Sequence, residues 1–296
     1  MRSLSALLAI FLLFSSSGIA QKDSSALEDI ITRFQDHKAY DRTDYPLGLY
    51  TEEHYKNEAD FAESLLKDLK KLDYSELSES QSISADLLKY DLKNTVKTYE
   101  YKAYLNPLLS DSGFHLSLNY QIRDLNNYDQ VKAYLNKLNA IPTYVDQHFK
   151  LLKEGLTEGI TQPLVIFEGY ENTYDSQIVD NYKDSYFYKP FENLPTTLSE
   201  KQKDSVLNAA EKAITKNVIP EFQRIKKFFE SEYFPKTRKT LGVSEIPNGD
   251  EYYDYLLEYY TTLDLSADEV HNIGLEEVKR INTEMKKVMA ETGFEG

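Results

Sequence analysis

The chain has 296 residues, a formal net charge of −15 and no cysteine. The lack of cysteine excludes disulfide bonds and thiolate metal sites. The acidic balance argues against nucleic-acid binding, which needs a basic surface, because lysine runs such as residues 67–71 also contain an acid and are typical of solvated helix faces. Eleven glycines and nine prolines are few for this length, which favours long helices over a turn-rich sheet.

Residues 1–20 have the pattern of a secretory signal peptide. Arg2 precedes an apolar run over residues 7–14, and the small residues Gly18 and Ala20 end the segment. The run is far shorter than the roughly 20 residues that a membrane-spanning helix needs, although a retained anchor is the alternative. No cysteine follows it that could carry a lipid. We therefore expect an exported protein, periplasmic or extracellular after cleavage, with no membrane span in residues 21–296.

Apolar residues recur at helical spacing along most of the remaining chain. The pattern predicts a mainly α fold, an irregular multi-helix array of long amphipathic helices over residues 21–296. Pro142 and Pro220 are expected in first turns, where a missing N–H costs nothing. Ser266 and Glu269 predict a capping box that opens the last helix. The predicted helical stretches include Phe61–Leu72, Leu87–Val96, Tyr128–Leu138, Pro142–Lys153, Glu200–Lys216, Ile219–Tyr233, Tyr252–Tyr260 and Ser266–Ala290.

Two segments depart from this pattern. Residues 164–167 are apolar and fit either a short strand or a buried turn. Residues 182–195 carry two prolines among aromatic residues, which predicts an irregular excursion that packs on the helical body. The 24 tyrosines fit the edges of a core better than a platform for carbohydrate or peptide.

No complete catalytic site is present in the sequence. A zinc peptidase helix needs His-Glu-x-x-His, and no pair of the five histidines has that spacing. Acids lie near His37, His54 and His271, at Asp41, Glu58 and Asp268, but such pairs are common on acidic helices. We therefore predict no catalytic, cofactor-binding or metal-ligating residue in this chain.

Several segments, taken in order, carry a more specific signal. They include Tyr188-Lys189-Pro190-Phe191, Val218-Ile219-Pro220, Ile246-Pro247-Asn248-Gly249 and Glu269-Val270-His271-Asn272-Ile273-Gly274-Leu275. From about Leu27 to Gly296 the chain resembles the bacterial "domain of unknown function 885" family.

The resemblance implies an activity that this chain does not complete. Relatives are roughly twice as long, look like zinc metallopeptidases with a helical cleft, and carry a His-Glu-x-x-Pro-Gly-His type segment in their second half. The resemblance thus implies that residues 21–296 are the amino-terminal half, one wall of a peptide-binding cleft, and inactive alone. Zinc is implied for the full-length protein only, and the partner would be the missing carboxy-terminal half.

Two questions stay open at this point. Among the five histidines, His271 is the candidate for a residue that faces the cleft. The alternative is that His271 is an ordinary residue near the start of a helix. The helical pattern continues almost to Gly296, so we expect a truncated reading frame. The alternative function is a self-sufficient exported scaffold whose tyrosines bind peptide or glycan.

Overall fold

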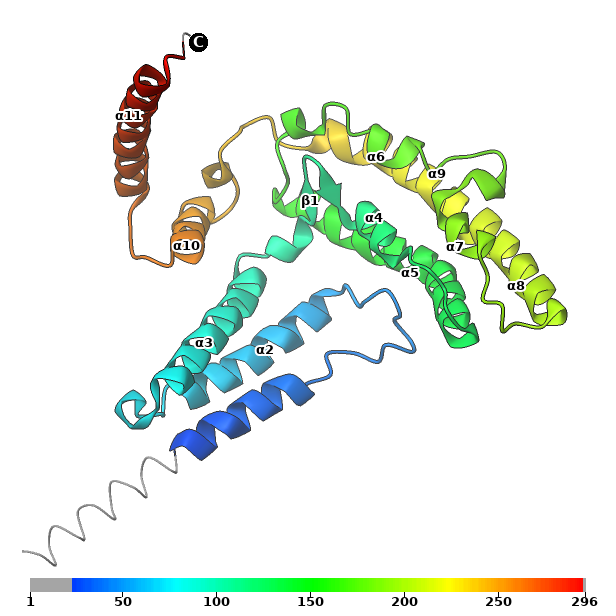
Figure 1. The fold of residues 1–296 in the computed structure, drawn as a ribbon, viewed down its shortest axis with the longest axis horizontal. Helices are drawn as coiled ribbons and strands as arrows, with labels where there is room; N and C mark the ends of the chain where they lie inside the picture. Colours follow the sequence, from blue (N-terminus) through cyan, green and yellow to red (C-terminus); the bar gives the residue numbers. More distant parts are fainter. Residues whose placement is uncertain (1–22, 295–296) are drawn as a thin grey trace, which may run out of the picture. The chain divides into compact units, whose positions relative to one another are not determined.

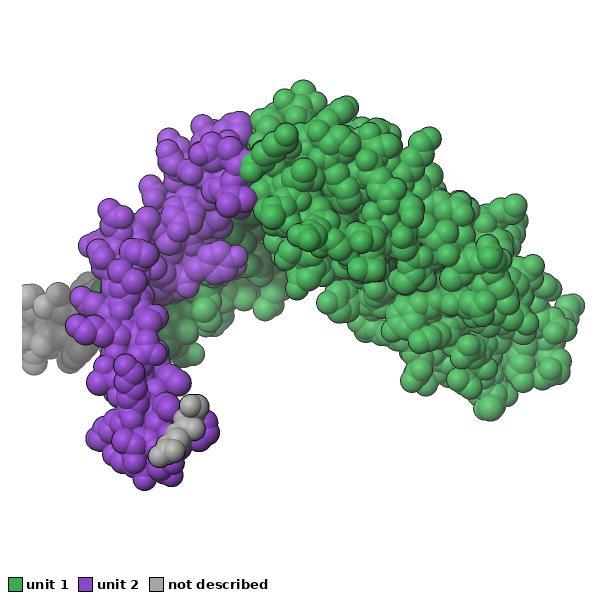
Figure 2. Space-filling model, turned by 90° about the horizontal axis from the view of Figure 1, so that it is seen from above, with its two compact units in different colours: residues 1–239 green, residues 240–296 purple. Residues whose placement is uncertain are grey.

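A computed structural model describes residues 23–294, so the predicted signal peptide at residues 1–20 lies outside the described residues. The described chain is mainly helical, as predicted (Figure 1). It divides into two compact units, residues 1–239 and residues 240–296, which Figure 2 colours separately. No helix among the described residues is long and apolar enough to cross a membrane.

The first part of unit 1 is built from three helices. A helix over residues 23–36, α2 (Glu52–Leu69) and α3 (Glu79–Glu100) share one apolar core. Its fully buried members include Leu27, Leu65 and Leu92.

Part of the apolar pattern of α3 faces away from the core. The apolar spacing that predicts this helix, read as one buried stripe, includes Leu87 and Leu88, but Leu87 is 66% exposed. Consecutive residues of a helix point about 100° apart, so the face that buries Leu88 and Leu92 turns Leu87 to solvent.

The main body of unit 1 is organised around α5 (Tyr128–Glu158), one helix of 31 residues. The prediction of a helix starting near Pro142 was wrong, because Pro142 lies inside α5. Asn127 caps the real start by accepting a hydrogen bond from the Gln130 N–H at 2.9 Å. Ile141 and Val145, at 1% and 0% exposure, flank the proline in the core. Their burial offsets the roughly 3 kcal/mol that an interior proline costs a helix.

Two prolines in the second long helical run each follow a π-helical segment. The segment η7 (Ile214–Val218) joins α8 (Glu200–Ala213) to α9 (Ile219–Phe228), and Pro220 lies in the first turn of α9, as predicted. A second one, η8 (Phe229–Tyr233), precedes η9 (Phe234–Lys236), which contains Pro235. A proline has no N–H and its ring clashes with the carbonyl four residues earlier. A wider π turn precedes each of these prolines, and the run stays helical.

The predicted excursion packs on these helices. It consists of short turns in which Phe187 and Phe191 are at most 2% exposed and belong to the main core. Residues 164–167 form a 3-10 turn and no strand. The short elements are η4 (Leu164–Phe167), α6 (Asn172–Asp175), η5 (Tyr182–Asp184), η6 (Tyr186–Tyr188) and α7 (Lys189–Glu192).

Short elements also connect α3 to α5. The strands β1 (Leu108–Leu109) and β2 (Ser112–Gly113) pair antiparallel and are the whole sheet within residues 23–294. The helical turns of this connection are η2 (Ala103–Leu105), α4 (Phe114–Ser117) and η3 (Leu118–Gln121), whereas η1 (Tyr74–Glu76) lies between α2 and α3.

Unit 2 contains η10 (Val243–Glu245), α10 (Gly249–Thr261) and α11 (Ala267–Thr292). The predicted capping box of α11 is present. The Ser266 hydroxyl accepts from the Glu269 N–H at 3.3 Å, and the Glu269 carboxylate accepts from the Ser266 N–H at 2.8 Å. No described residue of α11 is buried.

We expect Gly155→Ala to destabilise unit 1 by about 1–3 kcal/mol, as overpacking does in a close-packed interior. A Cβ at Gly155 would lie 2.8 Å from the Ile160 carbonyl oxygen and 2.9 Å from that of Leu105. The control is Gly274→Ala in α11, where a Cβ meets nothing within 4 Å. It should stabilise its helix by about 0.5–1 kcal/mol. Urea unfolding followed by circular dichroism measures both, and equal effects of the two substitutions would contradict the packing argument.

Candidate functional site

Two of the five histidines are sealed in the main core. His115 is 0% exposed and its Nε2 lies 2.8 Å from the Thr173 hydroxyl oxygen. Because that hydroxyl donates to the Tyr170 carbonyl at 2.6 Å, His115 Nε2 must carry the proton. His148 is 2% exposed, and its Nδ1–H donates to the Tyr144 carbonyl at 2.8 Å.

Both buried rings are neutral. Burial lowers the pKa of His115 to about 3 and, despite an opposing hydrogen bond to Tyr144, lowers that of His148 to about 4. A proton on His115 Nδ1 would have no acceptor, because that atom is buried without a hydrogen-bond partner. His148 stacks on Phe114 with ring centroids 4.6 Å apart. We conclude that these histidines act as packed aromatic groups, since no solvent reaches them.

Two other histidines lie near Glu58 of α2. His37 Nε2 lies 2.8 Å from Glu58 Oε1, and the His37 ring stacks on Phe61 at 3.8 Å. His54 lies one turn before Glu58 on α2, and burial lowers the pKa of its ring. A cavity of about 620 Å³ opens beside this group, lined by residues 37–42. The sequence paired His54 with Glu58 and His37 with Asp41, whereas the fold joins His37 to Glu58.

This group does not assemble a metal centre. Within residues 23–294, no cluster of three or more His, Asp or Glu side chains is arranged to hold a metal ion. A single imidazole–carboxylate pair can exchange a proton, but it does not hold the metal ion that would activate a water molecule.

His271, the predicted cleft residue, lies on the exposed surface of α11. It is seven residues before Val278 and fourteen before Met285, so the three share one line along the helix. None of the three cavities described for unit 1 includes it. The proposed role of His271 in a cleft therefore stays a prediction.

The same line of α11 belongs to a continuous apolar seam. Positions 274, 278, 281, 285 and 288 alternate four and three residues apart, which is the spacing of a helix that packs against another helix. Four of these side chains are large and about half exposed, namely Val278 at 57%, Ile281 at 46%, Met285 at 56% and Val288 at 55%. An exposed stripe of this kind is typical of a surface that binds another polypeptide.

The sequence matches the family model DUF885, described as bacterial protein of unknown function, over residues 35–296. The chain belongs to this family. Its fold is similar to a crystal structure of "the putative lipoprotein from Colwellia psychrerythraea", with a TM-score of 0.71 and 16% identity. The match covers 95% of this chain and 51% of that one, so the chain spans about half the length of this structural relative. No curated protein matches the sequence.

The family prediction is thereby confirmed, and the similar fold accounts for nearly the whole chain. The peptidase activity inferred from the resemblance is a separate matter, because a structural likeness at this identity establishes the fold alone.

We expect the two buried histidines to make the stability of unit 1 pH-dependent. Their pKa values are lower in the folded than in the unfolded chain, so the full stability is present above about pH 6.5 and is lost as the pH falls toward 4. Each histidine contributes a slope of about 1.4 kcal/mol per pH unit in that window. Urea unfolding at pH 4.5 to 7.5 measures the slope.

His115→Gln should reduce the slope by the share of one histidine, because glutamine does not titrate. Phe222→Leu is the matched control, since Phe222 is 1% exposed in the same core. It should lower the free energy of unfolding equally at every pH. A slope that is unchanged by His115→Gln would contradict this assignment.

Proposed function

We propose that this chain is the amino-terminal helical half of an exported zinc-dependent peptidase of the DUF885 family. In this proposal it supplies one wall of a peptide-binding cleft, and the carboxy-terminal half supplies the metal ligands. The metal would activate a water molecule and a carboxylate would take its proton, which is how amides are hydrolysed at neutral pH. The chain alone is then inactive.

The exposed seam of α11 is the observation that supports this proposal most directly. Monomeric proteins seldom leave a regular row of large apolar side chains half exposed, because covering each of them gains roughly 1.5–3 kcal/mol. In this proposal a helix of the other half of the family fold covers that seam, and the structural relative is long enough to contain such a half, because this chain covers 51% of it. His271 lies in line with the seam and would then face the junction of the two halves.

Export is supported by the signal-peptide pattern at residues 1–20 and by the description of the structural relative as a lipoprotein. The rival function, a scaffold with a tyrosine-rich binding face, has less support. Many tyrosines pack inside the cores, and Tyr170, Tyr174 and Tyr233 are at most 1% exposed.

We predict that the purified chain binds no stoichiometric zinc and cleaves no peptide. Mixed with a carboxy-terminal half of the family fold supplied as a separate chain, it should form a 1:1 complex that binds zinc and hydrolyses peptides in a chelator-sensitive manner. Elemental analysis, light scattering and a peptide-release assay measure the three properties.

Ile281→Asp should weaken the complex at least tenfold, because a carboxylate would be buried in the seam without a partner. Thr283→Asp is the matched control on the opposite face of α11, and it should leave association unchanged. Chelator-sensitive cleavage by the chain alone, or a stop codon and unrelated sequence after Gly296, would sink the proposal. A homodimer of this chain that buries the seam, and so prevents the other half from binding there, would also contradict the proposal.

A further inference from the structure

A cavity of unit 1 lies between the segment before α2 and one face of α5. It measures about 400 Å³, within the range of small-molecule sites. Residues 43–48 form one wall of this cavity. The other wall belongs to α5 and consists of Asn136, Asn139, Ala140, Thr143 and Tyr144, which recur at helical spacing and so share one face of the helix.

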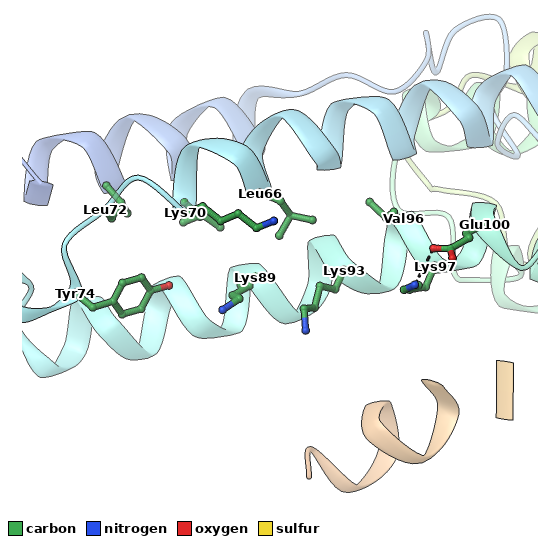
Figure 3. Close-up of a pocket in the computed structure, with 10 residues that line it drawn as sticks. Leu66, Lys70, Leu72, Tyr74, Lys89, Lys93, Val96, Lys97 and Glu100 are labelled. Atoms are coloured by element: carbon green, nitrogen blue, oxygen red, sulfur yellow. Dashed lines mark hydrogen bonds and ion pairs between the residues drawn. The ribbon is translucent and has the colours of Figure 1, made fainter. Parts of the chain in front are cut away.

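The lining of this cavity is polar but almost uncharged. The groove between α2 and α3, which Figure 3 shows, is different, because it is lined by four lysines and one glutamate. Lys97 and Glu100 of that groove already pair with each other at 2.8 Å. The cavity on α5 has one charged residue in its lining, Asp44. Amides and hydroxyls therefore supply most of its polar groups.

The polar residues of the α5 wall are not explained by the stability of the helix. Asn136, Asn139 and Thr143 are exposed in the interior of α5. Asparagine and threonine form helices less readily than alanine, lysine or glutamate. Local choices that cost stability without a packing gain are typical of functional sites.

One of these amides is already oriented. Asn217 Nδ2 donates a hydrogen bond to Asn139 Oδ1 at 2.9 Å. This contact fixes the Asn139 amide, and its own Nδ2 group retains N–H donors for a ligand.

The opposite wall is held in place by the chain itself. The Gly48 N–H donates to the Tyr45 carbonyl at 3.0 Å, and the Tyr50 N–H donates to Gln147 of α5, also at 3.0 Å. Gly48 has a φ of +107°, and a Cβ there would lie 2.7 Å from the Tyr50 ring, so only glycine fits. A wall that is formed before the ligand arrives loses little freedom on binding.

We propose that this cavity binds a neutral pyranose unit of a glycan. Sugar hydroxyls both donate and accept hydrogen bonds, and so do the asparagine amides and the Thr143 hydroxyl. Asp44 accepts from further hydroxyls, and Pro46 and Leu47 give the C–H face of the ring an apolar surface.

Other ligand classes match this lining less closely. An anion would meet the Asp44 carboxylate and no cation among the residues that line the cavity. An extended peptide is commonly bound along a strand edge or in an aromatic groove, and a helical peptide in an apolar groove. The wall over residues 43–48 and the polar face of α5 provide none of these.

The test titrates the full chain with cellobiose, maltose and N,N′-diacetylchitobiose, followed by calorimetry. We expect saturable one-to-one binding of at least one of them. The corresponding disaccharide with one uronic acid unit should bind at least tenfold more weakly, because its carboxylate would lie near Asp44.

The double variant Asn136→Ala and Thr143→Ala should lose at least tenfold in affinity, because two hydrogen-bonding groups are removed. Alanine is the better helix former, so this variant should melt no lower than the unaltered chain. A thermal melt therefore separates lost binding from lost folding.

The double variant Thr157→Ala and Asn208→Ala is the matched control. Both residues are exposed, in α5 and α8, and neither lines the cavity. The control makes the same two changes of residue type, and it should bind the sugar as the unaltered chain does.

Several outcomes would overturn the proposal. These are no saturable binding of any of the three disaccharides, an equal loss in both double variants, or tighter binding of the uronic acid. Binding of tetraglycine through Asn136 and Thr143, with no affinity for the sugars, would assign the cavity to a different ligand. None of these measurements depends on zinc or on peptidase activity, so this inference and the proposed function can fail separately.

Discussion

Each amphipathic helix of this protein has to cover its apolar face, and this requirement determines how the described helices pack. In unit 1 the requirement is met within the chain. The first three helices cover one another, and α5 is covered by α8, α9 and the excursion over residues 182–195. In unit 2 the requirement is not met for α11, whose seam from Val278 to Val288 stays half exposed. The seam is therefore the part of the described helices where this requirement supports the proposed second polypeptide.

Burial also decides what the histidines can do. Desolvation holds His115 and His148 neutral, and their hydrogen bonds fix the tautomers, so they contribute packing and a pH-dependent stability. In unit 1, His37 Nε2 lies within hydrogen-bond distance, 2.8 Å, of Glu58 Oε1. None of these groups assembles a metal centre within residues 23–294.

The α11 seam is apolar and regular, which favours another helix as its partner.

The sequence alone determined the helical class, most helix positions, the capping box at Ser266 and the family, because periodicity and capping are local properties of the chain. It could not place Pro142 inside α5, since tertiary burial of Ile141 and Val145 outweighs the local cost of the proline. Nor could it predict the π turns before Pro220 and Pro235. The contact of His37 with Glu58 was also decided by tertiary structure, because the two residues come from different segments of the chain and only packing brings them together.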